Sequence, residues 1–170
     1  MTEQREASED AVMTRIGQAV ILLHAGDREE ARNRLGEIWS EIGEGGDLLH
    51  RCTLAHYMAD AQDDPADELA WDLLALSAAE GIADGPPARR EPRQAVRVFY
   101  PSLHLSLAAD YVKLRRPEAA RAHLARARAA TSALADDGYG NGVRAAIARL
   151  ERRLDGDRGG RAGPFPEQGP

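Results

Sequence analysis

The chain has 170 residues, a length that fits one domain with a continuous core. Apolar residues make up 43% of it and aromatic residues only 5%, a composition that favours close-packed helices over a β-sandwich. The formal net charge of −6 argues against a general nucleic-acid binder, because phosphate contacts need a clustered cationic surface.

Apolar residues recur at helical spacing along nearly the whole chain, and strand-like alternation is almost absent, which predicts an all-α fold. Gly26 is predicted to end the first helix, Asp47 to cap the third, and Pro65 and Pro117 to open the fourth and the sixth. The helices are expected at about 9–24, 28–42, 47–61, 65–81, 96–114, 117–135 and 143–154.

The helical domain is predicted to span residues 9–155, because the segments on either side of it lack the helical pattern. Residues 1–8 are expected to be flexible, and the Gly/Pro-rich residues 156–170 to form a disordered tail. Glycine, proline and arginine pairs within 83–95 predict a loop inserted before the fifth helix, and Pro101 either opens that helix or bends it. Glycines between 138 and 142 predict a turn before the last helix.

The cysteine content and the N-terminal residues indicate the cellular compartment of the protein. Cys52 is the only cysteine, so an intramolecular disulfide and a cysteine-based zinc cluster are excluded. The first residues are polar and acidic, unlike a secretion signal, and the longest apolar run, 19–23, is too short to span a bilayer. We therefore predict a cytoplasmic protein that contacts neither membrane nor nucleic acid, and the arginine- and alanine-rich composition favours a bacterial source.

Small and large residues repeat in a way that joins the helices in pairs. In the clearest pair, Leu107, Ala108 and Tyr111 precede Ala120 and Leu124 on the following helix. Small positions let two helices approach closely, and large ones fill the space beside them. Weaker copies of the pattern comprise Ala19, Leu22, Ala31, Leu35 and Ile38 in the first pair and Leu54, Ala55, Met58, Ala70, Leu74 and Ser77 in the second.

This pattern resembles the tetratricopeptide repeat over about residues 12–134. The resemblance implies three antiparallel helix pairs in a short right-handed solenoid, with the seventh helix as a cap. It also implies that the first helix of each pair lines a concave, uncharged groove. The expected groove residues are Met13, Ile16, Val20, Leu23, Leu49, Cys52, His56, Ala59, Ser102, Leu105, Ala109 and Val112.

An apolar groove suits an amphipathic helix or an apolar peptide, so the resemblance implies a protein-interaction adaptor without catalytic activity or cofactor. Two alternatives stay open. The groove could be filled by the inserted loop, the seventh helix or a second copy of the chain in a homodimer. It could also hold a small apolar ligand, with His56 and His104 supplying polar contacts and the chain serving as an accessory protein or enzyme component.

Several polar residues stand out along these helices. His56 and Asp60 are four residues apart and share a helix face, with His104 on the equivalent helix of the next pair. Because further ligands at a recognised spacing are missing, we predict a hydrogen-bonded pair and neither a metal nor a catalytic site. An acidic cluster is interpreted as complementing the positive end of the fourth helix. Its members are Asp60, Asp63, Asp64, Asp67 and Glu68.

Overall fold

The computed structural model describes residues 2–85 and 90–161. Within these residues the fold is all-helical, as predicted, and no strand is present. None of these helices is both long and apolar enough to cross a membrane. The elements are α1 (Thr2–His24), α2 (Arg28–Ile42), α3 (Leu48–Asp60), α4 (Pro65–Ala83), α5 (Arg90–Lys113), α6 (Pro117–Ala130), the short 3-10 helix η1 (Thr131–Ala133) and α7 (Gly138–Arg161).

Three helices extend beyond their predicted bounds. α1 begins at Thr2, so the segment expected to be flexible is helical, in keeping with its Glu, Gln, Arg and Ala content. α5 begins at Arg90, which shortens the predicted 83–95 loop; residues 86–89 of that loop lie outside the described residues. α7 runs to Arg161 and takes in the first part of the predicted tail, whereas 162–170 lie outside the described residues.

The cap predicted at Asp47 is present, and α4 begins at Pro65 as predicted. The side chain of Asp47 accepts hydrogen bonds from the backbone N–H groups of Leu49 and His50. Asp64 accepts one from the N–H of Ala66, with Pro65 at the first position of α4. These bonds satisfy N–H groups that have no partner within the helix, and they explain why both starts could be read from the sequence.

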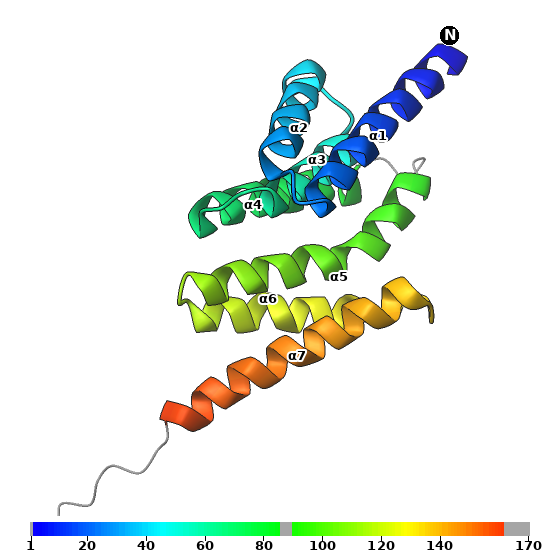
Figure 1. Ribbon diagram of the computed structural model, residues 1–170. Coiled ribbons are helices and arrows are strands. Elements are labelled where there is room, and N and C mark those ends of the chain that lie inside the picture. Colours follow the sequence, from blue (N-terminus) through cyan, green and yellow to red (C-terminus); the bar gives the residue numbers. More distant parts are fainter. Residues whose placement is uncertain (1, 86–89, 162–170) are drawn as a thin grey trace, which may run out of the picture.

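Pro101 lies inside α5 and is buried. Because proline has no N–H to donate to the preceding turn, it weakens the helix at this point. Figure 1 shows that α5 changes direction along its length. Of the two roles expected for Pro101, bending therefore applies, since the helix begins well before it.

The predicted turn at 138–142 is instead the start of α7. Asp137 accepts a hydrogen bond from the backbone N–H of Gly140 at 2.7 Å. A Cβ atom at Gly140 would lie only 2.1 Å from the carbonyl oxygen of Ala135, so this position accommodates glycine alone. Arg144 donates to the carbonyl oxygen of Leu134 and ties the new helix to the segment before it.

Consecutive helices pack against one another along the chain. α1 contacts α2, α3 contacts α4, α5 contacts both α4 and α6, and α7 lies against α6 and α5. Figure 1 shows this succession from α1 and α2 at one end to α7 at the other. Five of the small residues predicted at these contacts are fully buried, namely Ala19, Ala31, Ala55, Ala108 and Ala120.

The second helix of the second pair turns a different face inward. Ala70, Leu74 and Ser77, which were aligned with the repeat, are exposed. α4 instead buries Asp72, Ala75, Leu76, Ala78, Ala79 and Ile82. A carboxylate is therefore directed into the interior, against the α3 and α5 side of the fold.

Candidate functional site

The expected groove residues do not form one open apolar surface. Ile16, Leu23, Cys52 and Ala59 are buried. Cys52 packs in a core cluster with residues of α4 and α5 such as Leu103. Burial raises the pKa of the Cys52 thiol to about 12, so this side chain acts as a small buried hydrophobe.

The third-pair positions of the expected groove are covered by α7. Leu105 and Val112 pack, partly buried, against a core cluster that includes Ile147 of α7. The hydroxyl oxygens of Ser102 on α5 and Tyr139 on α7 lie 2.6 Å apart and share a hydrogen bond. Coverage by the seventh helix was one of the alternatives left open by the sequence.

Of the expected groove positions on α1, Met13 alone is exposed, and a second exposed apolar side chain, Ile21, lies outside the expected set. Met13 is 41% exposed, and Ile21, next to the half-buried Val20, is 69% exposed. Gly17 lies between them, where a Cβ atom would meet nothing within 4 Å. Met13, Gly17 and Ile21 follow one another at four-residue spacing and therefore form one open side of α1, which we term the α1 face.

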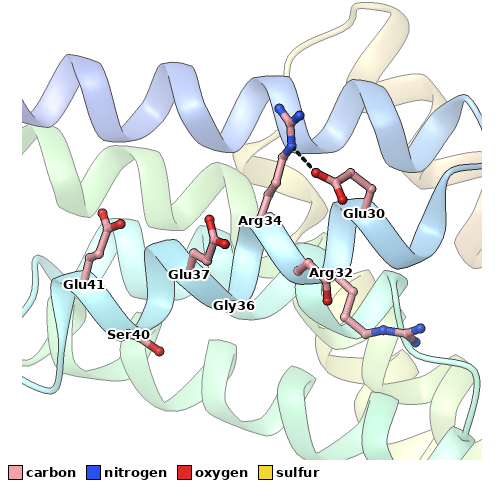
Figure 2. A pocket seen from close by; sticks show the side chains of 8 residues that line it. Glu30, Arg32, Arg34, Gly36, Glu37, Ser40 and Glu41 are labelled. Carbon is pink, nitrogen blue, oxygen red and sulfur yellow. Dashed lines mark hydrogen bonds and ion pairs between the residues drawn. The ribbon is translucent and has the colours of Figure 1, made fainter.

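An open hollow on the surface of α2 differs in character from the expected groove. Figure 2 shows charged side chains along it, with Nε of Arg34 donating to Glu30 at 2.9 Å. Arg15 of α1 pairs with Glu41 beside it. The lining is polar and largely self-paired, consisting of Glu30, Arg32, Asn33, Arg34, Gly36, Glu37, Ser40 and Glu41.

Three acidic side chains meet inside the fold, where α4 packs against α5. Glu68 and Asp72 share one face of α4, and Asp110 comes from α5. One carboxylate oxygen of each lies within 4.8 Å of the other two. Asp72 is 2% exposed and Asp110 is 0% exposed. Glu68, Asp72 and Asp110 are termed the carboxylate centre.

Several oxygens of the carboxylate centre have no hydrogen-bond donor. Nζ of Lys113 lies 2.9 and 3.0 Å from the two carboxylate oxygens of Glu68. Neither oxygen of Asp110, nor Oδ1 of Asp72, accepts a hydrogen bond from a described residue. Nδ1 of His56 on α3 is likewise without a hydrogen bond and lies 3.7 Å from Oδ1 of Asp72.

This environment disfavours the charged form of Asp110. Burial, followed by the hydrogen bonds and the charges of the Asp72 and Glu68 carboxyl groups, together raise its pKa to about 11. Burial also raises the pKa of Asp60, while the charge of His56 opposes that shift. The carboxylate centre can therefore hold a proton, or it can bind a cation through oxygen ligands.

The histidines expected to make polar contacts lie in two separate places. His56 approaches Asp72, and the predicted hydrogen bond to Asp60 is absent from the described residues. The His56 ring packs edge-on against Phe99, with 5.0 Å between centroids. His104 instead pairs with His123 of α6, so the two histidines do not share one binding site.

His104 and His123 form the middle of a stack of four rings. Their Nδ1 atoms are 3.1 Å apart, and Tyr100 and Tyr111 stack on the outer faces of the pair. Burial lowers the pKa of His104 to about 4, and burial also lowers that of His123. Both imidazoles are therefore neutral near pH 7, with one Nδ1 donating to the other.

Asp72 and Asp110 were missed from the sequence, and Glu68 was interpreted only as a helix-dipole partner. For Asp110 the sequence does carry an indication. This residue comes three positions after Leu107, on a helix face that was predicted to be buried. A carboxylate in such a position needs a partner inside the fold.

No protein-family model, no curated protein and no solved structure matches this chain. Its function is therefore inferred from its own residues.

Proposed function

We propose that this chain is a cytoplasmic helical-repeat adaptor, and that it binds a helix of a partner protein on the α1 face. The tetratricopeptide-like pattern and the packing of α1 on α2, α3 on α4 and α5 on α6 support a stack of helix pairs. In such stacks each pair buries apolar surface against its neighbours, and a terminal repeat needs a polar outer side to stay soluble alone.

The two ends of the proposed stack differ in the polarity of their outer sides. At the C-terminal end the outer side of α7 carries exposed arginines, including Arg149, Arg152 and Arg153. At the N-terminal end α1 exposes Met13 and Ile21. Among its described residues, α7 exposes one large hydrophobic side chain, Tyr139, whose hydroxyl shares a hydrogen bond with Ser102, whereas α1 leaves two wholly apolar side chains in solvent.

The observation that carries the proposal is the 69% exposure of Ile21, the most exposed large apolar side chain of the described residues. Two anchors eight residues apart on one side of a helix match the way one helix packs on another. Gly17 between the two anchors has no side chain, so a partner helix can approach the backbone closely. A partner helix on this face would extend the stack by one layer.

The test is affinity capture from the native cell with crosslinking and mass spectrometry, comparing the wild type with Met13→Glu/Ile21→Glu. Both side chains are exposed, so we expect an intact fold and a change in stability within about 0.5 kcal/mol. Capture of the wild-type partner should fall at least about tenfold, as for interface anchors worth more than about 1.4 kcal/mol.

A matched control is Ala125→Glu/Ala145→Glu, which places the same charges at exposed alanines of α6 and α7. This variant should capture the partner as the wild type does. Equal capture by the α1 variant and the wild type would overturn the proposal. Loss of a wild-type dimer by the α1 variant in light scattering would instead identify the partner as a second copy of the chain.

A further inference from the structure

We propose that the carboxylate centre, together with the imidazole of His56, binds one divalent transition cation such as Mn²⁺. This site lies in the interior between α3, α4 and α5. It does not depend on the adaptor function assigned to the α1 face.

The spacing of the three carboxylates suits a single ion. Metal–oxygen bonds to divalent cations are about 2.0–2.6 Å long, so two ligands on opposite sides of one ion lie about 4–5 Å apart. One oxygen from each member of the centre already lies within 4.8 Å of the others. Two ligands come from one face of α4 and the third from the facing helix α5, as in ion sites built inside helix bundles.

The second observation is the lack of donors for these buried oxygens. Asp72 and Asp110 are 2% and 0% exposed, and three of their oxygens accept no hydrogen bond from a described residue. Burying a carboxylate without a partner is strongly unfavourable, and nearly all buried polar groups in folded proteins have a hydrogen-bond partner. Because these oxygens point at one another, one cation would satisfy all of them.

The net charge of the carboxylate centre and its neighbours favours binding of a divalent cation. Lys113 is the cation paired with the centre, and both of its contacts go to Glu68. Three ionised carboxylates and one ammonium group leave a surplus of negative charge in the interior. No cationic side chain that the structure describes forms an ion pair with Asp110. A divalent cation would neutralise this surplus, with Glu68 shared between the ion and Lys113.

His56 decides the class of cation. Its free Nδ1 lies 3.7 Å from Oδ1 of Asp72, although it is not among the ligand atoms that lie within 4.8 Å of one another. A shift of the imidazole ring toward Asp72 would bring it to the same ion. Carboxylates alone suit Mg²⁺, Ca²⁺ and Mn²⁺, whereas imidazole suits transition ions. Three oxygens and one nitrogen therefore favour Mn²⁺ and related transition ions over Ca²⁺.

The rival occupant is a proton. A protonated Asp110 could donate a hydrogen bond to Asp72 or Glu68 and relieve their repulsion without any metal. The two occupants differ in what they predict. A proton-holding centre gains nothing from added Mn²⁺, whereas a cation site binds it in a one-to-one ratio and is stabilised by it.

The experiment uses the full chain, freed of metal by chelation and titrated with MnCl₂. Electron paramagnetic resonance measures free Mn²⁺, and thermal unfolding measures stability. We expect one bound Mn²⁺ per chain, a melting temperature that rises with Mn²⁺ by mass action, and weaker binding of Ca²⁺. Asp110→Asn and Asp72→Asn should each weaken Mn²⁺ binding by more than about tenfold, since loss of even a supporting contact has effects of that size.

His56→Phe keeps an aromatic ring beside Phe99, and it should weaken Mn²⁺ binding more than Ca²⁺ binding. The matched control is Asp67→Asn, which removes an exposed carboxylate in the same turn of α4 as Glu68 and should bind Mn²⁺ as the wild type does. If Asp110→Asn fails to fold, Glu68→Gln at the more accessible edge of the centre supplies the same comparison.

Absence of one-to-one Mn²⁺ binding by the wild type would overturn the proposal. So would equal binding by the wild type and the folded centre variants, or an equal loss in Asp67→Asn, because either result places the ion on the exposed acidic surface. Tighter binding of Ca²⁺ than of Mn²⁺ would overturn the role given to His56.

Discussion

The carboxylate centre can be predicted only in part from its residues: Glu68 and Asp72 share a helix face, whereas the position of Asp110 depends on helix packing. The spacing of Glu68 and Asp72 places both on one face of α4, and that half of the carboxylate centre can be read from the sequence. The other half requires α5 to pack against α4 in one register, which no local pattern specifies. Asp72 was overlooked because the repeat alignment predicted Ala70 and Leu74, now seen to be exposed, as the inward positions.

The His104–His123 pair predicts a pH dependence of stability. The pKa of His104 is lowered to about 4 by burial, and that of His123 is lowered as well. Unfolded histidines titrate near about 6.5, so below that pH the unfolded chain binds more protons than the folded chain. Protonation of His104 therefore destabilises the fold progressively as the pH falls from about 6.5 towards about 4, and His123 acts in the same direction.

His104→Phe removes one titrating group and keeps a ring between Tyr100 and His123. Its melting temperature should fall less steeply than that of the wild type over this pH range, measured by thermal unfolding at each pH. His24→Gln, at an exposed histidine, serves as the control and should follow the wild type. Parallel curves for His104→Phe and the wild type would show that the buried pair does not titrate as inferred.

At the scale of helices, the sequence indicated the boundaries that local caps and prolines mark, and it placed the starts of α1, α5 and α7 too late in the chain. Asp47, Asp64 and Pro65 mark helix starts through local bonds, which sequence patterns report directly. The start of α7 was mistaken for a turn because its glycines are poor helix formers. The bond from Gly140 to Asp137 and the close approach of Ala135 there depend on how the chain folds back.

Two glycines of α7 provide a matched pair of substitutions. Gly140→Ala would place its Cβ atom 2.1 Å from the carbonyl oxygen of Ala135. We expect it to destabilise the protein by about 1–3 kcal/mol, the usual cost of overpacking. At Gly142 a Cβ atom would meet nothing within 4 Å. Gly142→Ala should stabilise the helix by about 0.5–1 kcal/mol.

Urea denaturation of both glycine variants and the wild type measures these differences in unfolding free energy. Comparing the two variants isolates the effect of the close contact at Gly140, because both variants replace a glycine of the same helix by alanine. A Gly140→Ala variant as stable as Gly142→Ala would contradict the geometry given for the start of α7.

Ala108 tests the small-residue contact between α5 and α6. It is fully buried and shares a core cluster with Ala120 and Leu124. Ala108→Leu should lower the free energy of unfolding by about 1–3 kcal/mol, because no space exists for the added atoms. The control is Ala125→Leu on the exposed side of α6, which should change stability by less than about 0.5 kcal/mol in the same denaturation experiment. Equal stability of the two variants would contradict close approach of the helices at Ala108.

At the scale of the whole molecule, the sequence predicted the all-helical class and the buried alanines at helix contacts. It did not predict which surfaces stay open. Whether α7 covers Leu105 and Val112, or whether α1 leaves Ile21 exposed, depends on packing between segments far apart in the chain. The same non-local packing turns the expected groove residue Cys52 into part of the core and brings the carboxylate centre together.

The resulting picture has an apolar α1 face at one end of the helical stack and a buried acidic site in its middle. Because the carboxylate centre and His56 draw on α3, α4 and α5, a bound cation would link these three helices. Ion binding and stability of the stack would then be coupled, since an ion that binds only the folded chain stabilises it.

The most direct test is crystallography of the full chain grown or soaked with MnCl₂, with diffraction data collected to record the anomalous signal of manganese. The account predicts one strong peak among the carboxylate oxygens of Glu68, Asp72 and Asp110, within bonding distance of the His56 imidazole. Peaks confined to exposed carboxylates such as Asp63 and Asp67, with none inside the fold, would contradict it.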